Sequence, residues 1–255
     1  MSLCLSLVSH RQASLANQLL ADLRHCQAPD RLVVTCNTTE AVPLAPLPAG
    51  STRIDNPTPL GFAANHNQAF THCREDFFCV VNADLRLPAD PFPGLLARMA
   101  DPRVGVVAPM VLSPAGSIED NARHFPTIGS LLRKAAGGPD GRYLVQPTHD
   151  GQAIGVDWVA GMFLLFRAEA FRDVGGFDDK FFLYYEDVDI CARLWKAGWK
   201  VLLSPDITVV HDAQRASRRD PRYMAWHASS MTRYFFKHLG RLPRSSSDPG
   251  AGSGR

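Results

Sequence analysis

The chain has 255 residues, and 45% of them are hydrophobic, which is enough to fill the core of one sizeable domain. Its 27 Lys and Arg residues nearly balance 25 Asp and Glu, so charge gives no reason to expect a nucleic-acid partner. The most extended apolar run, residues 158–166, is far shorter than the ~18 residues that span a bilayer, and we expect at most a peripheral membrane contact.

The first third of the chain alternates strand-like and helix-like segments, which is the rhythm of βαβ units. Residue spacing predicts strands at 3–8, 32–35 and 52–54, and helices at 13–24 and 65–73. Phe77–Val81 is a short continuous apolar run, typical of a strand buried on both faces. We therefore expect an α/β fold.

The rest of the chain continues this alternation around one long irregular region. We predict helices at 88–99, 168–174, 187–197 and 224–239, and strands at 104–112, 156–166, 201–203 and 208–210. Residues 113–155 are rich in Gly, Pro and polar side chains, which predicts a long loop over the site. We expect one domain over 1–240 and a disordered C-terminal tail over 241–255.

The cysteines and the N-terminus indicate the compartment. The six cysteines have no paired metal-type spacing, which favours a reducing cytoplasm. Residues 1–9 alternate like a strand and lack the basic start of a signal peptide. Near the other end, Arg233, Lys237, His238, Arg241 and Arg244 lie close to Tyr234, Phe235 and Phe236. That mixture suits the inner face of an anionic membrane, although core packing of the aromatic side chains is the alternative.

The segment Asn82-Ala83-Asp84 directly follows the predicted buried strand at 77–81. In open α/β sheets, ligands lie beyond the carboxyl ends of the strands. The carboxylate of Asp84 suits a hard cation bound to a diphosphate. A simple turn is the alternative, because Asn and Asp are common turn residues.

A second polar cluster, Glu186, Asp187 and Asp189, stands at the start of a predicted helix. Crowded carboxylates raise one another's proton affinity, which favours a general base. Helix capping is the alternative and would explain one of the three acids.

A third candidate is His211, which directly follows the predicted strand at 208–210. Metal binding and core packing both remain open for a single histidine. The chain has neither a P-loop nor a GxGxxG motif, so ATPase and dehydrogenase activities have no supporting motif.

Four stretches in fixed order, at residues 56–67, 81–88, 156–167 and 175–193, resemble the family 2 inverting glycosyltransferases of the GT-A fold. The similarity runs from Leu3 to Gly240 and is greatest to the rhamnosyltransferase-like members. The resemblance implies a Rossmann-like, mixed but mostly parallel central sheet flanked by helices.

The resemblance also implies roles for individual residues. Asn82 and Asp84 match the family's DxD-like motif, with Asp84 and His211 holding a Mg²⁺ or Mn²⁺ ion on the donor diphosphate. Asp187 matches the general base, and Glu186 beside it is the second residue expected to be catalytic. Four residues are expected on the acceptor side, namely Trp158, Gly161, Glu186 and Asp189.

The donor side departs from the family pattern. The second strand usually ends in an Asp-Asn-Gly-Ser-like run that holds the nucleotide base, whereas this chain reads Val-Thr-Cys-Asn-Thr-Thr-Glu over 34–40. Ser9 and His10 replace the usual Tyr-Asn pair. The expected donor contacts, besides Asp84, are Ser9, Thr35, Asn37, Asn67 and Asn82.

Together these features predict a metal-dependent inverting glycosyltransferase that takes a sugar, with rhamnose as a candidate, from a dTDP- or UDP-sugar. The expected acceptor is a glycan or lipid-linked glycan in cell-surface polysaccharide synthesis. The altered segment at 35–40 motivates one alternative, a non-catalytic relative that binds nucleotide or glycan. A nucleotidyltransferase is a weaker alternative, because residues 9–12 do not form a Gly-rich basic loop.

Overall fold

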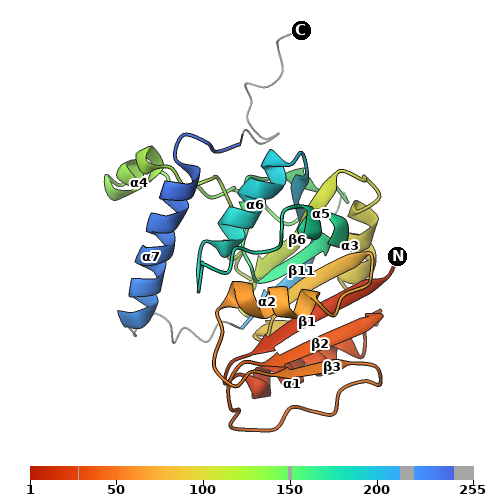
Figure 1. Ribbon diagram of the computed structural model, residues 1–255. Helices are drawn as coiled ribbons and strands as arrows, with labels where there is room; N and C mark the ends of the chain where they lie inside the picture. The colour runs from red at the N-terminus through yellow and green to blue at the C-terminus, as the bar shows by residue number, and fades with distance from the viewer. Residues whose placement is uncertain (28, 149–150, 213–220, 244–255) are drawn as a thin grey trace.

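The centre of the protein is a mixed β-sheet with helices on both faces (Figure 1). The computed structural model describes residues 1–27, 29–148, 151–212 and 221–243. Within these residues nine strands form the main sheet: β1 (Leu3–Ser9), β2 (Arg31–Cys36), β3 (Thr52–Asp55), β4 (Phe77–Asn82), β5 (Leu85–Arg86), β6 (Val104–Leu112), β8 (Ile154–Gly155), β10 (Phe163–Arg167) and β11 (Lys200–His211). Two further strands, β7 (Ala122–Arg123) and β9 (Trp158–Val159), pair separately.

The strand order is β3-β2-β1-β4-β10-β6-β11-β5, with β8 beside β11. The four strands β3, β2, β1 and β4 are parallel, and β6 is parallel to β11. Strand β10 runs antiparallel to both of its neighbours, β4 and β6. The expected mostly parallel sheet is therefore confirmed, and the carboxyl ends of β1, β2, β4, β6 and β11 share one edge.

The described helices are α1 (Ala13–Leu23), α2 (Phe62–Phe70), α3 (Phe92–Arg98), α4 (Ile128–Ala135), α5 (Ala168–Asp173), α6 (Glu186–Lys196) and α7 (Pro221–His238). All of them except α4 supply apolar side chains to two cores, one on each face of the sheet. Leu19 of α1 and Leu95 of α3 are buried in one core with Leu5 and Leu7 of β1. Phe171 of α5 is buried in the other, whose strand residues alternate with those of the first because side chains in a strand point to opposite faces.

Two expected strands differ in the structure. The predicted strand at 156–166 is broken into β9 and β10, because the chain turns at Ala160–Met162 and β10 joins β4 only from Phe163 onward. The predicted pieces at 201–203 and 208–210 are one strand, β11, whose register against β6 shifts between Ser204 and Thr208.

Other boundaries differ by a few residues. Helix α2 begins at Phe62, before the predicted start at 65, and α3 begins at Phe92, after the predicted start at 88. Proline lies at the first turn of α3, where its missing N–H costs no helical hydrogen bond. The predicted loop over 113–155 contains β7, α4 and β8, and its other described residues are irregular. The predicted tail at 241–255 lies mostly outside the described residues, as does Arg244.

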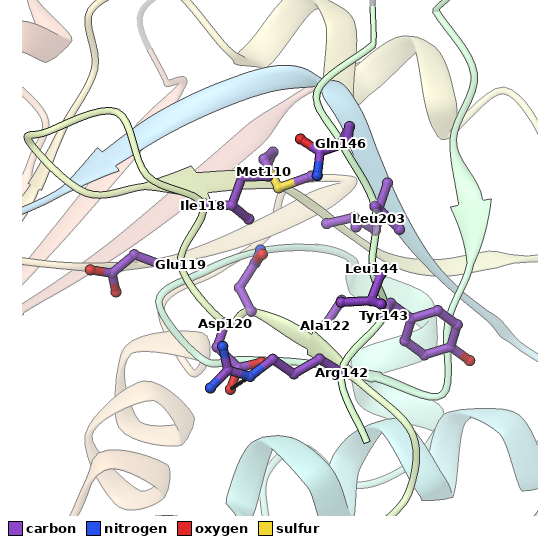
Figure 2. A pocket seen from close by; sticks show the side chains of 12 residues that line it. Met110, Ile118, Glu119, Asp120, Ala122, Arg142, Tyr143, Leu144, Gln146 and Leu203 are labelled. Carbon is purple, nitrogen blue, oxygen red and sulfur yellow. Dashed lines mark ion pairs between the residues drawn. The ribbon is translucent and has the colours of Figure 1, made fainter. Parts of the chain in front are cut away.

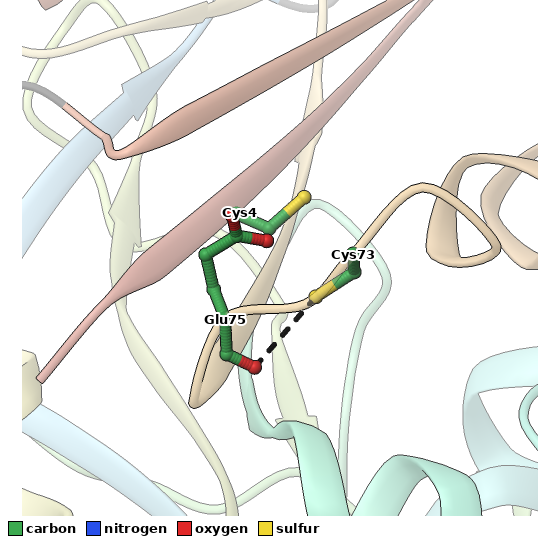
Figure 3. Close-up of side chains that lie close together, drawn as sticks. All are labelled: Cys4, Cys73 and Glu75. Atoms are coloured by element: carbon green, nitrogen blue, oxygen red, sulfur yellow. Dashed lines mark hydrogen bonds between the residues drawn. The ribbon is translucent and has the colours of Figure 1, made fainter.

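At the amino end of β1, one strand residue meets two side chains that are distant from it in the sequence. The ligand-type atoms of Cys4, Cys73 and Glu75 lie within 4.8 Å of one another (Figure 3). Arg31 Nε lies 3.1 Å from Glu75 Oε1 and already supplies a positive charge there. A neighbouring guanidinium opposes a bound cation. The cluster also lies at the amino end of the strands, away from the carboxyl edge where ligands of α/β sheets bind.

None of the helices in the described parts of the chain is long and apolar enough to span a membrane.

Candidate active site

Strands β4 and β11 bring Asp84 and His211 together at the carboxyl edge of the sheet. Asp84 follows β4, and His211 is the last residue of β11. The short strand β5 pairs antiparallel with the end of β11, with Leu85 opposite His211. The N–H of Asp212 also donates to the carbonyl oxygen of Asp84 at 2.8 Å. Backbone pairing therefore fixes the two side chains next to each other.

His211 lies between two carboxylates. Its Nε2 is 3.2 Å from Asp84 Oδ2, and its Nδ1 is 3.0 Å from Glu119 Oε2. Burial lowers the pKa of His211, but the hydrogen bonds to Asp84 and Glu119 outweigh burial and raise it to about 9. Both ring nitrogens of His211 therefore have carboxylate partners.

Glu119 was not among the residues predicted from the sequence. It lies in the irregular region after β6, where its N–H donates to the carbonyl oxygen of Val111 at 2.8 Å. That bond ties Glu119 to the end of a strand adjacent to β11. No pattern in the sequence distinguished Glu119 from the other polar residues of this region.

The residues of this cluster suit a divalent cation. Carboxylate oxygen is the ligand that Mg²⁺ and Mn²⁺ prefer, and an imidazole nitrogen joins such sets in many metal sites. Metal-bound histidines usually donate their second ring N–H to a carboxylate, which is the position that Glu119 occupies. Asp84 and His211 could therefore hold the ion, with Glu119 orienting the imidazole.

A cavity of about 210 Å³ adjoins this cluster on the side of Glu119 (Figure 2). Its walls come from the ends of β6 and β7, from β11 and from the segment 142–146. Arg142 Nε lies 3.3 Å from Asp120 Oδ2, so an ion pair closes one side. The cavity combines apolar and charged lining next to the candidate metal ligands.

The turn at Ala160–Met162 connects the metal cluster to the acidic cluster. The carbonyl oxygen of Met162 accepts the N–H of Asn82 at 2.9 Å. On the other side, the N–H of Gly161 donates to Asp187 Oδ2 at 3.0 Å. A Cβ at Gly161 would stand 3.1 Å from the ring of Phe62, so the close approach favours glycine. The broken strand thus places Gly161 between the two clusters.

Asp187 is held by backbone groups in the first turn of α6. Besides the bond from Gly161, its Oδ1 accepts the N–H of Val188 at 2.8 Å. Burial raises the pKa of Asp187, and the two backbone hydrogen bonds oppose that rise. Asp187 is therefore an oriented carboxylate with increased proton affinity, as a general base requires.

Glu186 is buried beside Asp187. Its Oε2 has no hydrogen-bond partner among the residues that the structure describes. Burial and then the charge of Asp187 raise the pKa of Glu186 well above its ordinary value. Because a buried, unpaired carboxylate is costly when ionised, Glu186 holds a proton more readily than Asp187 does.

The chain reaches α6 through two residues in left-handed conformation. Tyr184 and Tyr185 have φ values of 70° and 67°, which side chains with a Cβ rarely adopt. Such strain persists only where the surrounding structure enforces it, and it gathers at functional sites. Here it directs the first turn of α6 toward Gly161.

Asp189 lies apart from Gly161 and Asp187. Its fully buried carboxylate contacts Arg193 of α6 at 2.7 Å, and Lys237 and His238 of α7 at 2.7 and 2.8 Å. Burial raises the pKa of Asp189, but these partners, His238 first, outweigh burial and lower it to about 2. This placement favours an anchor between helices over contact with an acceptor.

Trp158, expected on the acceptor side, lies in β9 opposite Arg123 of β7. Its indole N–H donates to the carbonyl oxygen of His124 at 3.1 Å. It is partly exposed, so part of the ring remains open to a ligand.

On the expected donor side, Ser9 is bound to Glu40. Ser9 Oγ donates to Glu40 Oε1 at 2.6 Å, and Glu40 Oε2 accepts the N–H of Ala13 at 3.1 Å. Glu40 therefore caps the N-terminus of α1, where unpaired N–H groups favour a negative charge. The sequence had given Glu40 no role beyond its place in the altered segment.

Three other residues expected to contact the donor differ in whether their polar atoms already have partners. Asn37 bonds both ways to the backbone of Leu60, at 2.8 Å each. Asn67 bonds both ways to the backbone of Phe177, at 2.9 and 2.8 Å. Thr35 is fully buried, and its Oγ1 has no hydrogen-bond partner within the described chain. The side-chain amides of Asn37 and Asn67 are therefore occupied by hydrogen bonds within the fold, whereas the hydroxyl of Thr35 has no partner among the described residues.

The family model described as glycosyl transferase family group 2 matches residues 77–225. This range contains β4, the turn at Gly161 and the start of α6. The chain belongs to this family of glycosyltransferases. The resemblance drawn from the four sequence stretches is confirmed.

Characterised relatives include two rhamnosyltransferases. The chain is 33% identical over 165 residues to N-acetylglucosaminyl-diphospho-decaprenol L-rhamnosyltransferase of Mycobacterium tuberculosis, covering 61% of this chain and 53% of that one. It is 27% identical over 184 residues to rhamnosyltransferase WbbL of Escherichia coli, and the match covers 68% of this chain and 69% of WbbL. The chain therefore spans about half the length of the mycobacterial relative.

Solved structures confirm the GT-A fold. One is the mannosyltransferase PcManGT from Pyrobaculum calidifontis in complex with GDP-Man and Mn²⁺, with a TM-score of 0.59 at 18% sequence identity. The superposition covers 92% of this chain and 63% of the mannosyltransferase chain. Another is GalNAc-T7 with UDP, GalNAc and Mn²⁺, with a TM-score of 0.63 at 12% sequence identity. That superposition covers 83% of this chain and 43% of the GalNAc-T7 chain.

Proposed function

We propose that the protein is a metal-dependent, inverting glycosyltransferase that moves a sugar from a nucleotide-sugar donor to an acceptor hydroxyl. The observation that carries the proposal is the meeting of Asp84 and His211 at 3.2 Å at the carboxyl edge of the sheet. Parallel α/β sheets bind ligands at that edge. The turn through Gly161 connects this pair to Asp187.

In this proposal Asp84 and His211 hold the cation, and Asn82 stands beside the donor diphosphate. When bound, a divalent cation offsets the charge that develops on the departing nucleotide. Ser9, Thr35 and Asn37 form the end of the donor site nearest the base. The free hydroxyl of Thr35 supports this assignment more directly than the occupied amides of Asn37 and Asn67 do.

Asp187 acts as the general base. It takes the proton from the acceptor hydroxyl as that oxygen attacks the anomeric carbon from the face opposite the nucleotide, so the configuration inverts. Its raised pKa supports this role, because proton transfer is most efficient when the pKa of the base approaches the working pH. Glu186 stays protonated beside Asp187, and Trp158 and Gly161 border the acceptor.

The names of the relatives support a more specific substrate. Two of them are rhamnosyltransferases, and one acts on a decaprenol-linked sugar by its name. We propose a dTDP- or UDP-sugar as the donor, with rhamnose as the first sugar to test. The proposed acceptor is a lipid-linked glycan in cell-surface polysaccharide synthesis, reached from the cytoplasmic face of a membrane.

The test starts with a panel of nucleotide sugars, each titrated calorimetrically with and without Mn²⁺ and assayed for hydrolysis or transfer. Asp84→Ala should lose most metal-dependent donor binding, because it removes the carboxylate that faces His211. Unchanged affinity in Asp84→Ala would remove Asp84 from the metal site. Donor binding without any turnover across acceptors would favour the non-catalytic alternative.

His211→Ala separates a metal ligand from a structural residue. A ligand variant should lose Mn²⁺ affinity while its melting temperature changes little. A variant that loses stability first would assign His211 to the fold.

A further inference from the structure

Helices α4 and α7 present an unusual surface. Within the described chain α4 buries none of its side chains, although it is well formed and begins with a reciprocal cap between Thr127 and Ser130. Ile128 and Leu132 lie four residues apart, so they share one exposed face. Leu132 is 67% exposed. The apolar face of α4 therefore contributes nothing to the core of the fold.

The outer face of α7 is also apolar and uncharged. Tyr234 and His238 anchor the helix on its buried side. At about 100° per residue, one face opposite them carries Met224, Ala225, Ala228, Thr232 and Phe236. Met224 is 73% exposed and Phe236 is 83% exposed. Large apolar side chains at this exposure mark an interaction surface when they gather on one side of a molecule.

The charges carried by the two helices themselves have one sign. Neither α4 nor α7 contains an Asp or Glu. Three basic side chains, Arg133 and Lys134 on α4 and Arg233 on α7, are exposed and form no ion pair with any residue that the structure describes. Cations that flank an apolar face fit an anionic bilayer, into which apolar side chains insert while the basic groups contact the lipid phosphates.

The two helices lie on the same side of the protein. Figure 1 shows α4 beside one end of α7, at the margin of the molecule away from β2 and β3. Burial lowers the pKa of His227 on α7, and the charge of Lys134 on α4 lowers it further, so Lys134 lies within electrostatic range of α7.

The buried side of α7, opposite this surface, faces the candidate active site. Ser230 Oγ of α7 donates to the carbonyl oxygen of Leu183 at 2.9 Å. The rings of Tyr234 and Tyr185 lie 5.3 Å apart, and Tyr185 directly precedes α6. One helix, α7, therefore lies between the outer surface and the segment that positions Asp187.

We infer that α4 and the outer face of α7 form a membrane-contact surface that docks the protein on anionic lipid beside its acceptor. The inference rests on the proposed function, because a lipid-linked acceptor must be reached at a bilayer. Its occupant is the phospholipid surface itself, contacted by Ile128, Leu132, Met224 and Phe236 and by the basic side chains at their margin.

The test is co-sedimentation of the full chain with phosphatidylcholine vesicles, with and without phosphatidylglycerol. The native protein should bind the anionic vesicles more tightly, and salt should weaken that binding. Arg133→Glu with Lys134→Glu should lower affinity for anionic vesicles about 25-fold or more, since each basic group near such a surface contributes about fivefold. Leu132→Ser with Phe236→Ser should weaken binding to both kinds of vesicle.

Matched controls lie at the far end of the sheet. Arg24→Glu changes an exposed cation, and Val42→Ser changes an exposed apolar side chain, and neither should alter binding. Native protein that stays in solution with every vesicle, or controls that lose as much binding as the α4 and α7 variants, would overturn the inference. So would a native dimer that these variants convert to a monomer, because the surface would then join two copies of the chain.

Metal-dependent donor hydrolysis without vesicles separates this inference from the proposed function. The surface variants should hydrolyse the donor at the native rate, because none of them touches Asp84, His211 or Asp187. Vesicle binding that is lost while hydrolysis is retained supports the surface. Vesicle binding without any hydrolysis would instead contradict the proposed function and leave the surface in place.

Discussion

Asp187 differs from the other acids of its cluster in what holds it. Backbone N–H groups of Gly161 and Val188 orient both of its oxygens, whereas Glu186 has an unpaired oxygen and Asp189 is bound by three basic side chains. An acid fixed by backbone groups keeps its direction when a ligand arrives. Asp187 is therefore the one carboxylate of the three suited to meet an acceptor hydroxyl.

Replacing Asp187 with Asn should reduce turnover about 10²–10⁴-fold, because the amide cannot accept a proton. The variant keeps the size of the side chain and one acceptor oxygen, so it can accept the N–H of Gly161 or that of Val188 but not both. Donor affinity should stay close to native, and the melting temperature should fall only modestly. Steady-state rates, calorimetry with the donor and thermal melting test this expectation. Asp179→Asn, which changes an exposed acid, is the control.

If Asp187 served only as a helix cap, the pattern would reverse. Asp187→Asn would then turn over normally, and Asp187→Ala would lose about 0.5–2 kcal/mol of stability. Near-normal turnover by well-folded Asp187→Asn would move attention to Glu186.

In the proposed metal site, Glu119 would act through His211. Glu119→Gln removes the carboxylate that faces His211 Nδ1 and should weaken Mn²⁺ binding about 10–100-fold, as loss of such supporting acids does in metal sites. Direct calorimetric titration of Mn²⁺ measures the effect without turnover. Glu169→Gln, on the exposed side of α5, should leave affinity unchanged. Equal affinities in the two variants would contradict the role of Glu119.

At the scale of elements, one carboxylate joins α6 to α7. Asp189 of α6 is fully buried, and its partners Lys237 and His238 belong to α7. Removing one member of a buried ion cluster leaves its partners uncompensated. The contact of α7 with the fold therefore depends on the charge of Asp189.

Asp189→Asn should lower the free energy of unfolding by about 3–5 kcal/mol, because Lys237 and Arg193 would lose a buried counter-charge. Urea denaturation at neutral pH measures the change. Asp178→Asn is a graded comparison, since Asp178 also pairs with Lys237 but is partly exposed, and it should cost less. A loss of less than about 0.5 kcal/mol in Asp189→Asn would show that the cluster is dispensable.

The same acid makes the protein sensitive to low pH. The pKa of Asp189 is about 2 in the folded protein against an ordinary value of 3.8. Its ionised form therefore stabilises the fold above pH 3.8 by about 2 kcal/mol, and this contribution is lost as pH falls toward 2. The stability difference between native protein and Asp189→Asn should shrink over that interval in urea titrations. A difference that stays constant down to pH 2 would contradict this coupling.

Sequence periodicity predicted six of the seven described helices and most strands, because their apolar spacing follows from which faces are buried. It missed α4, which buries no side chain and lies in a segment expected to be a loop. It did not predict the break between β9 and β10. Residues 156–166 are apolar enough for one strand, and the turn at Gly161 depends on two remote contacts, with Asn82 and Asp187. The local apolar spacing favours one continuous strand, but these tertiary contacts stabilise the turn instead.

For the whole molecule, the sequence alone indicated Asp84, His211 and Asp187 but not how they are assembled. The proximity of Asp84 and His211 depends on β5 pairing with β11, which no local pattern encodes. Glu119 and Glu40 remained unrecognised because each is an isolated acid in an irregular segment. Their partners, His211 and Ser9, come from distant parts of the chain.

A metal ion bound by Asp84 and His211 should stabilise the whole fold, since it would connect residues that are distant in the sequence. At Mn²⁺ a hundredfold above its dissociation constant, the free energy of unfolding should rise by about 2.7 kcal/mol. Urea denaturation with and without Mn²⁺ tests this, and Asp84→Ala should abolish the gain. An equal gain in Asp84→Ala would place the ion elsewhere.

The pairing of β5 with β11 also sets an order of events during synthesis. Asp84 leaves the ribosome long before His211, and no local contact can join them until β11 adds to the sheet beside β6. Contacts that are remote in the sequence form late because closing the intervening chain costs entropy. A growing chain would therefore bury much of its sheet before it could retain a metal ion, and competence to bind the ion would mark completed folding.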